Sequence, residues 1–186
     1  MTSGSDQRQG EEPDLGLIGR WKSGDGRAAT ILVARHSQAL ARFVASSGGR
    51  VETEEIVQDT FVRAFAAIDS FRGESSFRTW LFTIARRLLM DRRRAEKRRG
   101  NTVEISDTDS VSEYGALDTI LAEETAERVR LALTKLTPTQ REVFTLRVQQ
   151  GLAYKEIAEV VGSTEGAARV HYHNAVETIK RLLKDD

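Results

Sequence analysis

The sequence predicts an all-α protein with two small helical domains joined by an acidic flexible linker, and with a helix-turn-helix in the C-terminal domain. Three observations predict this fold. Apolar residues recur at three- and four-residue spacing, strand-like alternation never runs longer than a few residues, and a polar acidic stretch divides the 186-residue chain. We expect a disordered tail at 1–13, domains at 14–99 and 118–186, and a linker at 100–117. Few contacts should join the two domains across that linker.

The N-terminal domain is expected to contain four helices. A short helix over 15–25 and a longer one over 27–47 are followed by a glycine pair, which commonly ends a helix. Residues 51–68 carry an apolar stripe with an acidic opposite face, which is typical of an amphipathic helix. The fourth helix begins near Phe77, where Ser75 or Ser76 can cap it.

The fourth helix is basic as well as amphipathic. Residues 86–99 hold eight Lys or Arg and two acidic residues, and aromatic residues lie close by. Cations hold nucleic-acid phosphates, and exposed aromatic rings stack on unpaired bases. The spacing of Phe77 and Trp80 favours a core position over such stacking, whereas for Phe71 and Phe82 both interpretations stay open. A merely solvated arginine face is the alternative for the cations.

The net charge of zero hides a strong segregation of charge. Directly after the basic helix, residues 101–127 hold eight acidic residues and no Lys or Arg. This stretch is either a tether kept soluble by its charge or a mimic of nucleic acid. Composition alone favours neither.

The C-terminal domain is predicted to contain four more helices, of which the last three have clear boundaries. Thr137 and Gln140 can form a capping box around Pro138, and a short helix over 154–161 stops at Gly162. Thr164 can then cap a longer helix that extends to about residue 183. A short helix, a tight glycine turn and a longer helix predict a helix-turn-helix, with an ordinary helical hairpin as the alternative.

The long last helix would read DNA with its outer face. Its core stripe is predicted at Ala168, Tyr172, Ala175 and Ile179. The outer positions are then Arg169, Val170, His171, His173 and Asn174. An Asn side chain pairs with adenine and a Val side chain contacts a thymine methyl group, so this face suits the major groove.

Several function classes are excluded or disfavoured. The chain has no cysteine, so thiolate metal sites and cysteine nucleophiles are excluded, and neither a signal peptide nor a membrane span is visible, which predicts a cytoplasmic protein. His171 and His173 diverge around a helix and His36 is remote, so we expect no metal site and no cofactor. No Walker loop, G-x-S-x-G elbow or H-E-x-x-H motif occurs, and we expect no enzyme.

Two segments resemble a known family, the extracytoplasmic-function (ECF) sigma factors of bacterial RNA polymerase. TEEIVQDTFVRAFAAIDSFRGESSFRTWLFTIARRLLMDRRR is similar to their second conserved region, and LTPTQREVFTLRVQQGLAYKEIAEVVGSTEGAARVHYHNAV to their fourth. The likeness covers about residues 14–184, and two motifs in the family's order are more specific than either alone.

The resemblance implies partners and site residues. The partners would be core RNA polymerase, promoter DNA and an anti-sigma factor, with no membrane insertion. Core polymerase would contact Glu55, Gln58, Asp59 and Val62. The minus-10 element, with a flipped base, would contact Phe71, Arg72, Ser75, Ser76, Thr79, Arg86, Arg87, Met90 and Arg93. The minus-35 element would contact Thr164, Arg169, Val170, His171, His173 and Asn174. The acidic linker is similar to family linkers that thread the RNA channel.

The sequence also departs from the family. Family members usually carry Lys or Arg where His171 and Asn174 stand, and Asn where Arg87 stands. Minus-35 binding should therefore be altered and dependent on pH, since histidine titrates near neutrality. Three rival functions remain in view: a helix-turn-helix regulator that does not replace the sigma subunit, a nucleic-acid-processing enzyme and a purely structural helical protein.

Overall fold

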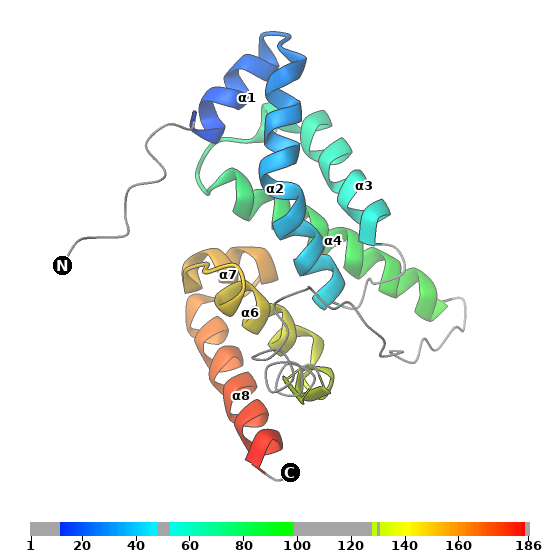
Figure 1. The fold of residues 1–186 in the computed structure, drawn as a ribbon, viewed down its shortest axis with the longest axis vertical. Coiled ribbons are helices and arrows are strands. Elements are labelled where there is room, and N and C mark those ends of the chain that lie inside the picture. The colour runs from blue at the N-terminus through cyan, green and yellow to red at the C-terminus, as the bar shows by residue number, and fades with distance from the viewer. Residues whose placement is uncertain (1–11, 48–52, 99–127, 130, 185–186) are drawn as a thin grey trace, which may run out of the picture.

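The computed structural model describes residues 12–47, 53–98, 128–129 and 131–184, and within these ranges every regular element is a helix (Figure 1). The predicted all-α class is confirmed. Throughout the same ranges, no helix combines the length and the apolar composition that a membrane span needs. The predicted tail, the linker at 100–117 and the acidic stretch at 101–127 lie outside the described residues.

The N-terminal half is built around α2, which packs against α1, α3 and α4. The elements of this half are α1 (Asp14–Lys22), α2 (Gly26–Ser46), α3 (Thr53–Ala66), a short 3-10 helix (Ile68–Ser70) and α4 (Phe77–Arg98). Phe43 of α2 meets Phe82 of α4 edge to face, with ring centroids 5.2 Å apart. The sequence left open whether Phe82 packs in the core or stacks on a base. Because Phe82 is 1% exposed, it is a core residue and cannot stack on a base.

Short polar contacts define where the helices begin. The Ser76 hydroxyl accepts a hydrogen bond from the Thr79 backbone N–H at 3.0 Å, so Ser76 is the cap of α4, one of the two candidates expected. Asp25 caps α2 in the same way through the N–H of Arg27, at 3.0 Å. These caps fix the direction in which α2 and α4 leave their loops.

The C-terminal half contains α6 (Pro138–Val148), α7 (Tyr154–Val161) and α8 (Glu165–Lys184), and residues 131–134 before them are also helical. The predicted capping box is confirmed, since Thr137 and Gln140 each bond the other's backbone N–H. Ala132 and Leu136 pack with Ala175 and Ile179 of α8 into a small cluster that belongs to this half alone.

The expectation that few contacts join the two halves is wrong. α7 packs against α4 and α6 against α2, as Figure 1 shows where the C-terminal helices lie beneath the N-terminal ones. Leu146 of α6 and Ile157 of α7 belong to the same buried cluster as Leu40 of α2 and Leu81 of α4. The reason is the hydrophobic effect, because apolar positions on α6 and α7 that their own half leaves uncovered are buried against the N-terminal half.

His36 of α2 is a buried histidine that links this helix to Asp14 of α1. Its Nε2 lies 2.8 Å from Oδ2 of Asp14, and Arg35 donates to Oδ1 of the same carboxylate at 2.6 Å. His36 is 7% exposed, and its ring meets the Phe77 ring edge to face. Burial raises the pKa of Asp14, but the hydrogen bonds and charges of His36 and Arg35 outweigh it and hold that pKa below its ordinary value of 3.8.

This carboxylate predicts a pH-dependent stability. A lowered folded pKa stabilises the fold fully above pH 3.8, and the contribution is lost as pH falls through the lowered value. We expect Asp14→Asn to reduce the free energy of unfolding by about 1 to 2 kcal/mol near neutral pH, and the difference from the wild type to shrink in acid. Thermal unfolding from about pH 7 to pH 3 measures this.

The matched control is Asp69→Asn, which removes a carboxylate whose side chain is 93% exposed and bonded only at the surface to Lys22. It should change stability little at any pH. A difference for Asp14→Asn that stays constant down to the acid transition would contradict the assignment.

Candidate nucleic-acid interface

The helix-turn-helix turns at Gly162, which ends α7 with a left-handed backbone, φ +65°. Two residues later the Thr164 hydroxyl accepts the Ala167 backbone N–H at 3.1 Å and caps α8, as expected. Ala168, Ala175 and Ile179 of α8 are buried, while Tyr172 of the same predicted stripe is half-buried. The turn and the cap therefore present one face of α8 to the core and the opposite face to solvent.

The six residues expected to contact the minus-35 element lie on the surface of this unit. Thr164, Arg169, Val170, His173 and Asn174 are exposed, and His171 is half-buried. Val170 is 57% exposed although it is apolar. Arg169 bonds Glu165 one turn earlier at 2.5 Å. The structure thus brings these residues together on one surface.

Tyr154, at the start of α7, is a residue of this surface that the sequence did not single out. The guanidinium carbons of Arg147 and Arg169 lie 4.8 and 4.5 Å from its ring centroid, and the ring meets Tyr172 edge to face. Such cation–π contacts restrain long arginine side chains. The orientation of Arg169 therefore depends on α7 as well as on its own helix. The only sequence feature that could have pointed to Tyr154 is weak: it is an aromatic residue at the first position of the shorter helix.

Much of the expected minus-10 surface on α4 lies against the C-terminal half. Nε of Arg86 donates to Glu142 of α6 at 2.8 Å, and Nη1 of Arg93 donates to the other oxygen of that carboxylate at 3.3 Å. Arg93 also donates to the Ser47 carbonyl. Glu142 is 1% exposed, so its charge is compensated from the other half of the chain.

A second polar contact lies farther toward the start of α4. Thr79, which is fully buried, donates to Glu156 of α7 at 3.0 Å. Its neighbour Arg78 donates to Gln150 at 2.6 Å. Burial lowers the pKa of Arg78. Sequence reasoning missed Glu142, Gln150 and Glu156, because they lie 49 to 77 residues along the chain from their partners.

The remaining expected minus-10 residues stay nearer to solvent. Phe71 is half-buried and meets Trp80 and Phe77, with centroids 5.1 and 5.7 Å away. Arg72, Ser76 and Arg87 are exposed, while Ser75 and Met90 are half-buried. The loop before α4 therefore rests on an aromatic cluster that can hold its conformation.

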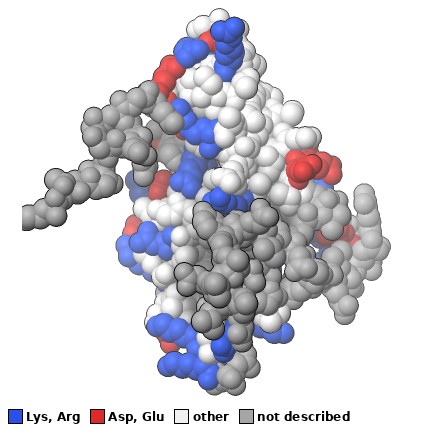
Figure 2. All heavy atoms as spheres, viewed as in Figure 1, with Lys and Arg blue, Asp and Glu red and all other residues white. Residues whose placement is uncertain are grey.

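The outer face of α3 is acidic and contains one exposed apolar residue. Arg92 of α4 lies 2.6 Å from a Glu55 oxygen and 3.9 Å from an Asp59 oxygen. Gln58 is exposed and Val62 is 68% exposed. In Figure 2 acidic side chains gather on the flank where Figure 1 places α3. All four residues expected to contact the polymerase therefore belong to one surface.

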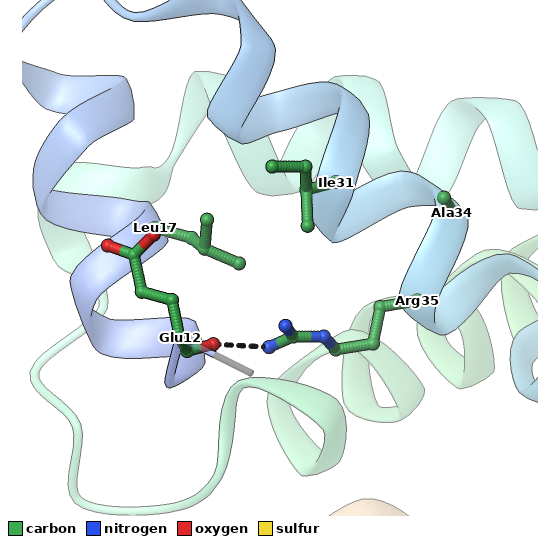
Figure 3. A pocket seen from close by; sticks show the side chains of 5 residues that line it. All are labelled: Glu12, Leu17, Ile31, Ala34 and Arg35. Atoms are coloured by element: carbon green, nitrogen blue, oxygen red, sulfur yellow. Dashed lines mark hydrogen bonds between the residues drawn. The ribbon is translucent and has the colours of Figure 1, made fainter. Parts of the chain in front are cut away.

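The hollow drawn in Figure 3, with a volume of about 450 Å³, lies between α1 and α2 and is open to solvent. Leu17, Ile31 and Ala34 line it, and Arg35 donates to the Glu12 carbonyl across one end at 2.9 Å. These side chains include no nucleophile beside a base. Among the described residues no three His, Cys, Asp or Glu side chains cluster as metal ligands would. The hollow carries no sign of catalysis.

Comparison with known families and proteins matches both halves. Residues 32–99 match Sigma-70 region 2, and residues 126–179 match Sigma-70, region 4. The chain is 34% identical over 174 residues to the ECF RNA polymerase sigma factor BldN of Streptomyces coelicolor. The matched region covers 91% of this chain and 66% of BldN. It is 32% identical over 180 residues to the ECF RNA polymerase sigma-E factor of Escherichia coli, covering 92% of this chain and 94% of that protein.

Two solved structures have a similar fold. The sigma factor RpoE, solved in complex with the anti-sigma factor NepR from Bartonella quintana, gives a TM-score of 0.72 at 29% identity and covers 84% of this chain and 97% of its own. CnrH, solved in complex with the cytosolic domain of CnrY, gives 0.69 at 31% identity, covering 94% and 99%.

The turn of the helix-turn-helix predicts opposite outcomes for two glycine-to-alanine changes. Gly162→Ala puts a Cβ on a left-handed residue and should destabilise the C-terminal half by about 1 to 2 kcal/mol. Gly166→Ala lies inside α8, where an added Cβ meets nothing closer than 4.0 Å, and should stabilise by up to about 1 kcal/mol. Chemical denaturation measures the change in the free energy of unfolding for each variant. Changes of the same sign in both variants would contradict this account of the turn.

Proposed function

This chain belongs to the ECF sigma factors, which are regulatory DNA-binding proteins of transcription initiation, and we propose that it binds core RNA polymerase, recognises the minus-10 and minus-35 promoter elements and promotes DNA melting without ATP. The observation that carries the proposal is one chain that joins a basic helix, an acidic exposed helix and a helix-turn-helix with an open polar face. The polymerase supplies the chemistry of RNA synthesis, while this chain supplies position and sequence recognition.

For the minus-35 element, the outer face of α8 enters the major groove. Asn174 is exposed there and its amide can pair with adenine N6 and N7, while the exposed Val170 contacts a thymine methyl group. Arg169, steadied by Tyr154, binds phosphate or a guanine edge. By the resemblance, His171 and Asn174 stand where family members usually carry Lys or Arg, so this face offers fewer permanent charges to the phosphates.

For the minus-10 element, α4 and the loop before it hold a strand that has begun to melt. Arg86, Arg87 and Arg93 neutralise its phosphates. Phe71 and the exposed loop residues Arg72 and Ser76 receive a flipped base. Melting then follows from differential binding, because these groups bind the unpaired strand better than the duplex.

For core polymerase, the docking surface is α3. Val62 supplies an exposed apolar anchor, and Glu55, Gln58 and Asp59 surround it with polar groups. The acidic segment before α6 enters the RNA channel of the enzyme. RpoE and CnrH were each solved with a further protein, in the first case an anti-sigma factor, and this supports an anti-sigma partner for the present chain as well.

Docking on core enzyme is the direct test of the proposed function. Val62→Glu puts a charge at the centre of the α3 surface and should lower the affinity for sigma-free core polymerase at least about tenfold, with a matching loss of run-off transcription. Stability should hardly change, because the position is exposed. Pull-down with core enzyme and run-off transcription on a genomic promoter library measure both effects.

The matched control is Val148→Glu, at a valine of α6 that is 54% exposed. It adds the same charge to another surface and should leave core binding unchanged. A wild-type chain that neither binds core enzyme nor yields new transcripts would refute the proposed function, and equal losses in the two variants would refute the role of α3.

Base readout by α8 is tested on promoters that the wild type transcribes. Asn174→Ala should cost about 1 to 3 kcal/mol at one A·T position of the minus-35 element and flatten the preference there, leaving other positions unchanged. Competition binding of the polymerase holoenzyme to single-base promoter variants measures this. Gln149→Ala, which truncates an exposed amide at the end of α6, should change nothing. A uniform loss over all positions would assign Asn174 to phosphate rather than to a base.

A further inference from the structure

We propose that Leu15 of α1 forms one wall of the site that receives the flipped minus-10 base, so that the base lies between the loop 71–76 and the first turn of α1. This inference rests on the proposed function, which assigns the loop to the minus-10 element. It adds a residue and a helix to which the proposed function gives no contact with DNA. The ligand is one unpaired base of the non-template strand, bound through its face.

Leu15 lies beside this loop, although the two are far apart in the sequence. Figure 1 shows the chain passing α1 on its way from the end of α3 to the start of α4. The loop turns at Gly73, whose backbone is left-handed, φ +72°. A Cβ added to Gly73 would lie 3.7 Å from Cδ2 of Leu15, which is ordinary van der Waals contact. The bare backbone of the turn therefore faces the leucine side chain.

The Leu15 side chain is accessible to a ligand, because it stays outside the buried core. It is 63% exposed, whereas Leu17 and Ile18 of the same helix are 1% and 5% exposed and anchor α1. One exposed leucine is ordinary on a protein surface and indicates nothing by itself. What distinguishes Leu15 is its place against the turn of the loop, where a base seated on that loop would cover it.

The first turn of α1 and the two ends of the loop share one buried support. Asp14, the neighbour of Leu15 in the chain, lies 2.8 Å from Nε2 of His36. The His36 ring meets Phe77, which follows the loop, and Phe77 in turn meets Phe71, at which the loop begins. These contacts hold both walls of the site in place before a base arrives, so less side-chain freedom is lost on binding.

The two walls offer complementary chemistry. On the loop side, Arg72 and Ser76 are exposed polar side chains that can bond a phosphate or the edge of a base. A base also has two faces, which gain free energy when they are buried against hydrocarbon. Leu15 supplies such a surface from the side of α1. Because leucine has no hydrogen-bonding group, it adds affinity for the base without selecting among the edges of different bases.

Promoter probes that each lack one base test this contact. The probes are forked duplexes with an unpaired minus-10 element, taken from a promoter that the wild-type holoenzyme transcribes. Leu15→Ser should lower the affinity of the holoenzyme for the intact probe about three- to tenfold, because apolar contact area is lost. At one abasic position the wild type should lose the same contact, so there the two losses should not add. Leu15→Met keeps the hydrocarbon and should bind as the wild type does.

The matched control is Leu131→Ser, which makes the same change at a leucine of the C-terminal half that is 47% exposed. It should leave the affinity for every probe unchanged. Equal losses for Leu15→Ser and Leu131→Ser, or losses that add at every abasic position, would overturn the proposal.

A photoreactive benzoylphenylalanine in place of Leu15 gives a direct readout of the contact. In the irradiated holoenzyme it should crosslink to one nucleotide of the minus-10 non-template strand, which primer extension identifies. This readout decides the proposal if circular dichroism shows that Leu15→Ser loses helix, and crosslinks that miss the minus-10 element would overturn it. A wild-type holoenzyme that binds no promoter would overturn the proposed function and this inference together. Normal wild-type binding without an effect at Leu15 would overturn this inference alone.

Discussion

A buried carboxylate needs cations beside it to compensate its charge. In this protein the carboxylate belongs to the C-terminal half of the chain and the cations belong to the N-terminal half. Glu142 of α6 is 1% exposed and is bonded to Arg86 and Arg93 of α4. Removing either partner by mutation would leave an uncompensated buried charge, which costs far more than the loss of a surface ion pair. The ion pair joins α6 to α4, beside the packing of α7 against α4 and of α6 against α2.

The apolar contacts around this ion pair explain why the halves meet at all. Leu146 and Ile157 share one buried cluster with Leu40 and Leu81, so hydrophobic burial supplies the attraction and the charges supply the register. The same α4 helix therefore packs against the C-terminal half and carries the arginines that we propose to bind nucleic acid.

Helix α8, by comparison, is positioned by contacts within the C-terminal half. Gly162 and Thr164 fix the turn and the start of α8, and the small residues Ala168 and Ala175 let that helix approach its neighbours closely. Arg169 is restrained by Tyr154 from the preceding helix. The contacts that position the start of α8 and the Arg169 side chain therefore come from its own half of the chain. Sequence-specific contacts benefit from such preorganisation, since less side-chain freedom is lost on binding.

Helix positions, caps and the two-motif order could be predicted from the sequence, because they depend on periodicity and on hydrogen bonds between near neighbours. The capping box of Thr137 with Gln140 and the buried position of Phe77 are examples. Phe82 could not be assigned in this way. Its place off the core stripe leaves both a buried and an exposed position open, and in the structure it is buried against Phe43.

The sequence by itself determined the helices, the charge segregation and the outer face of α8, since each follows from residue types a few positions apart. Only the tertiary structure decided that Thr79 is buried and that Arg86 and Arg93 pair with Glu142. Their partners lie in another part of the chain, and no local pattern specifies which distant carboxylate will replace water around a guanidinium. That choice depends on how apolar faces of α2, α4, α6 and α7 fit together, which is a property of the whole fold.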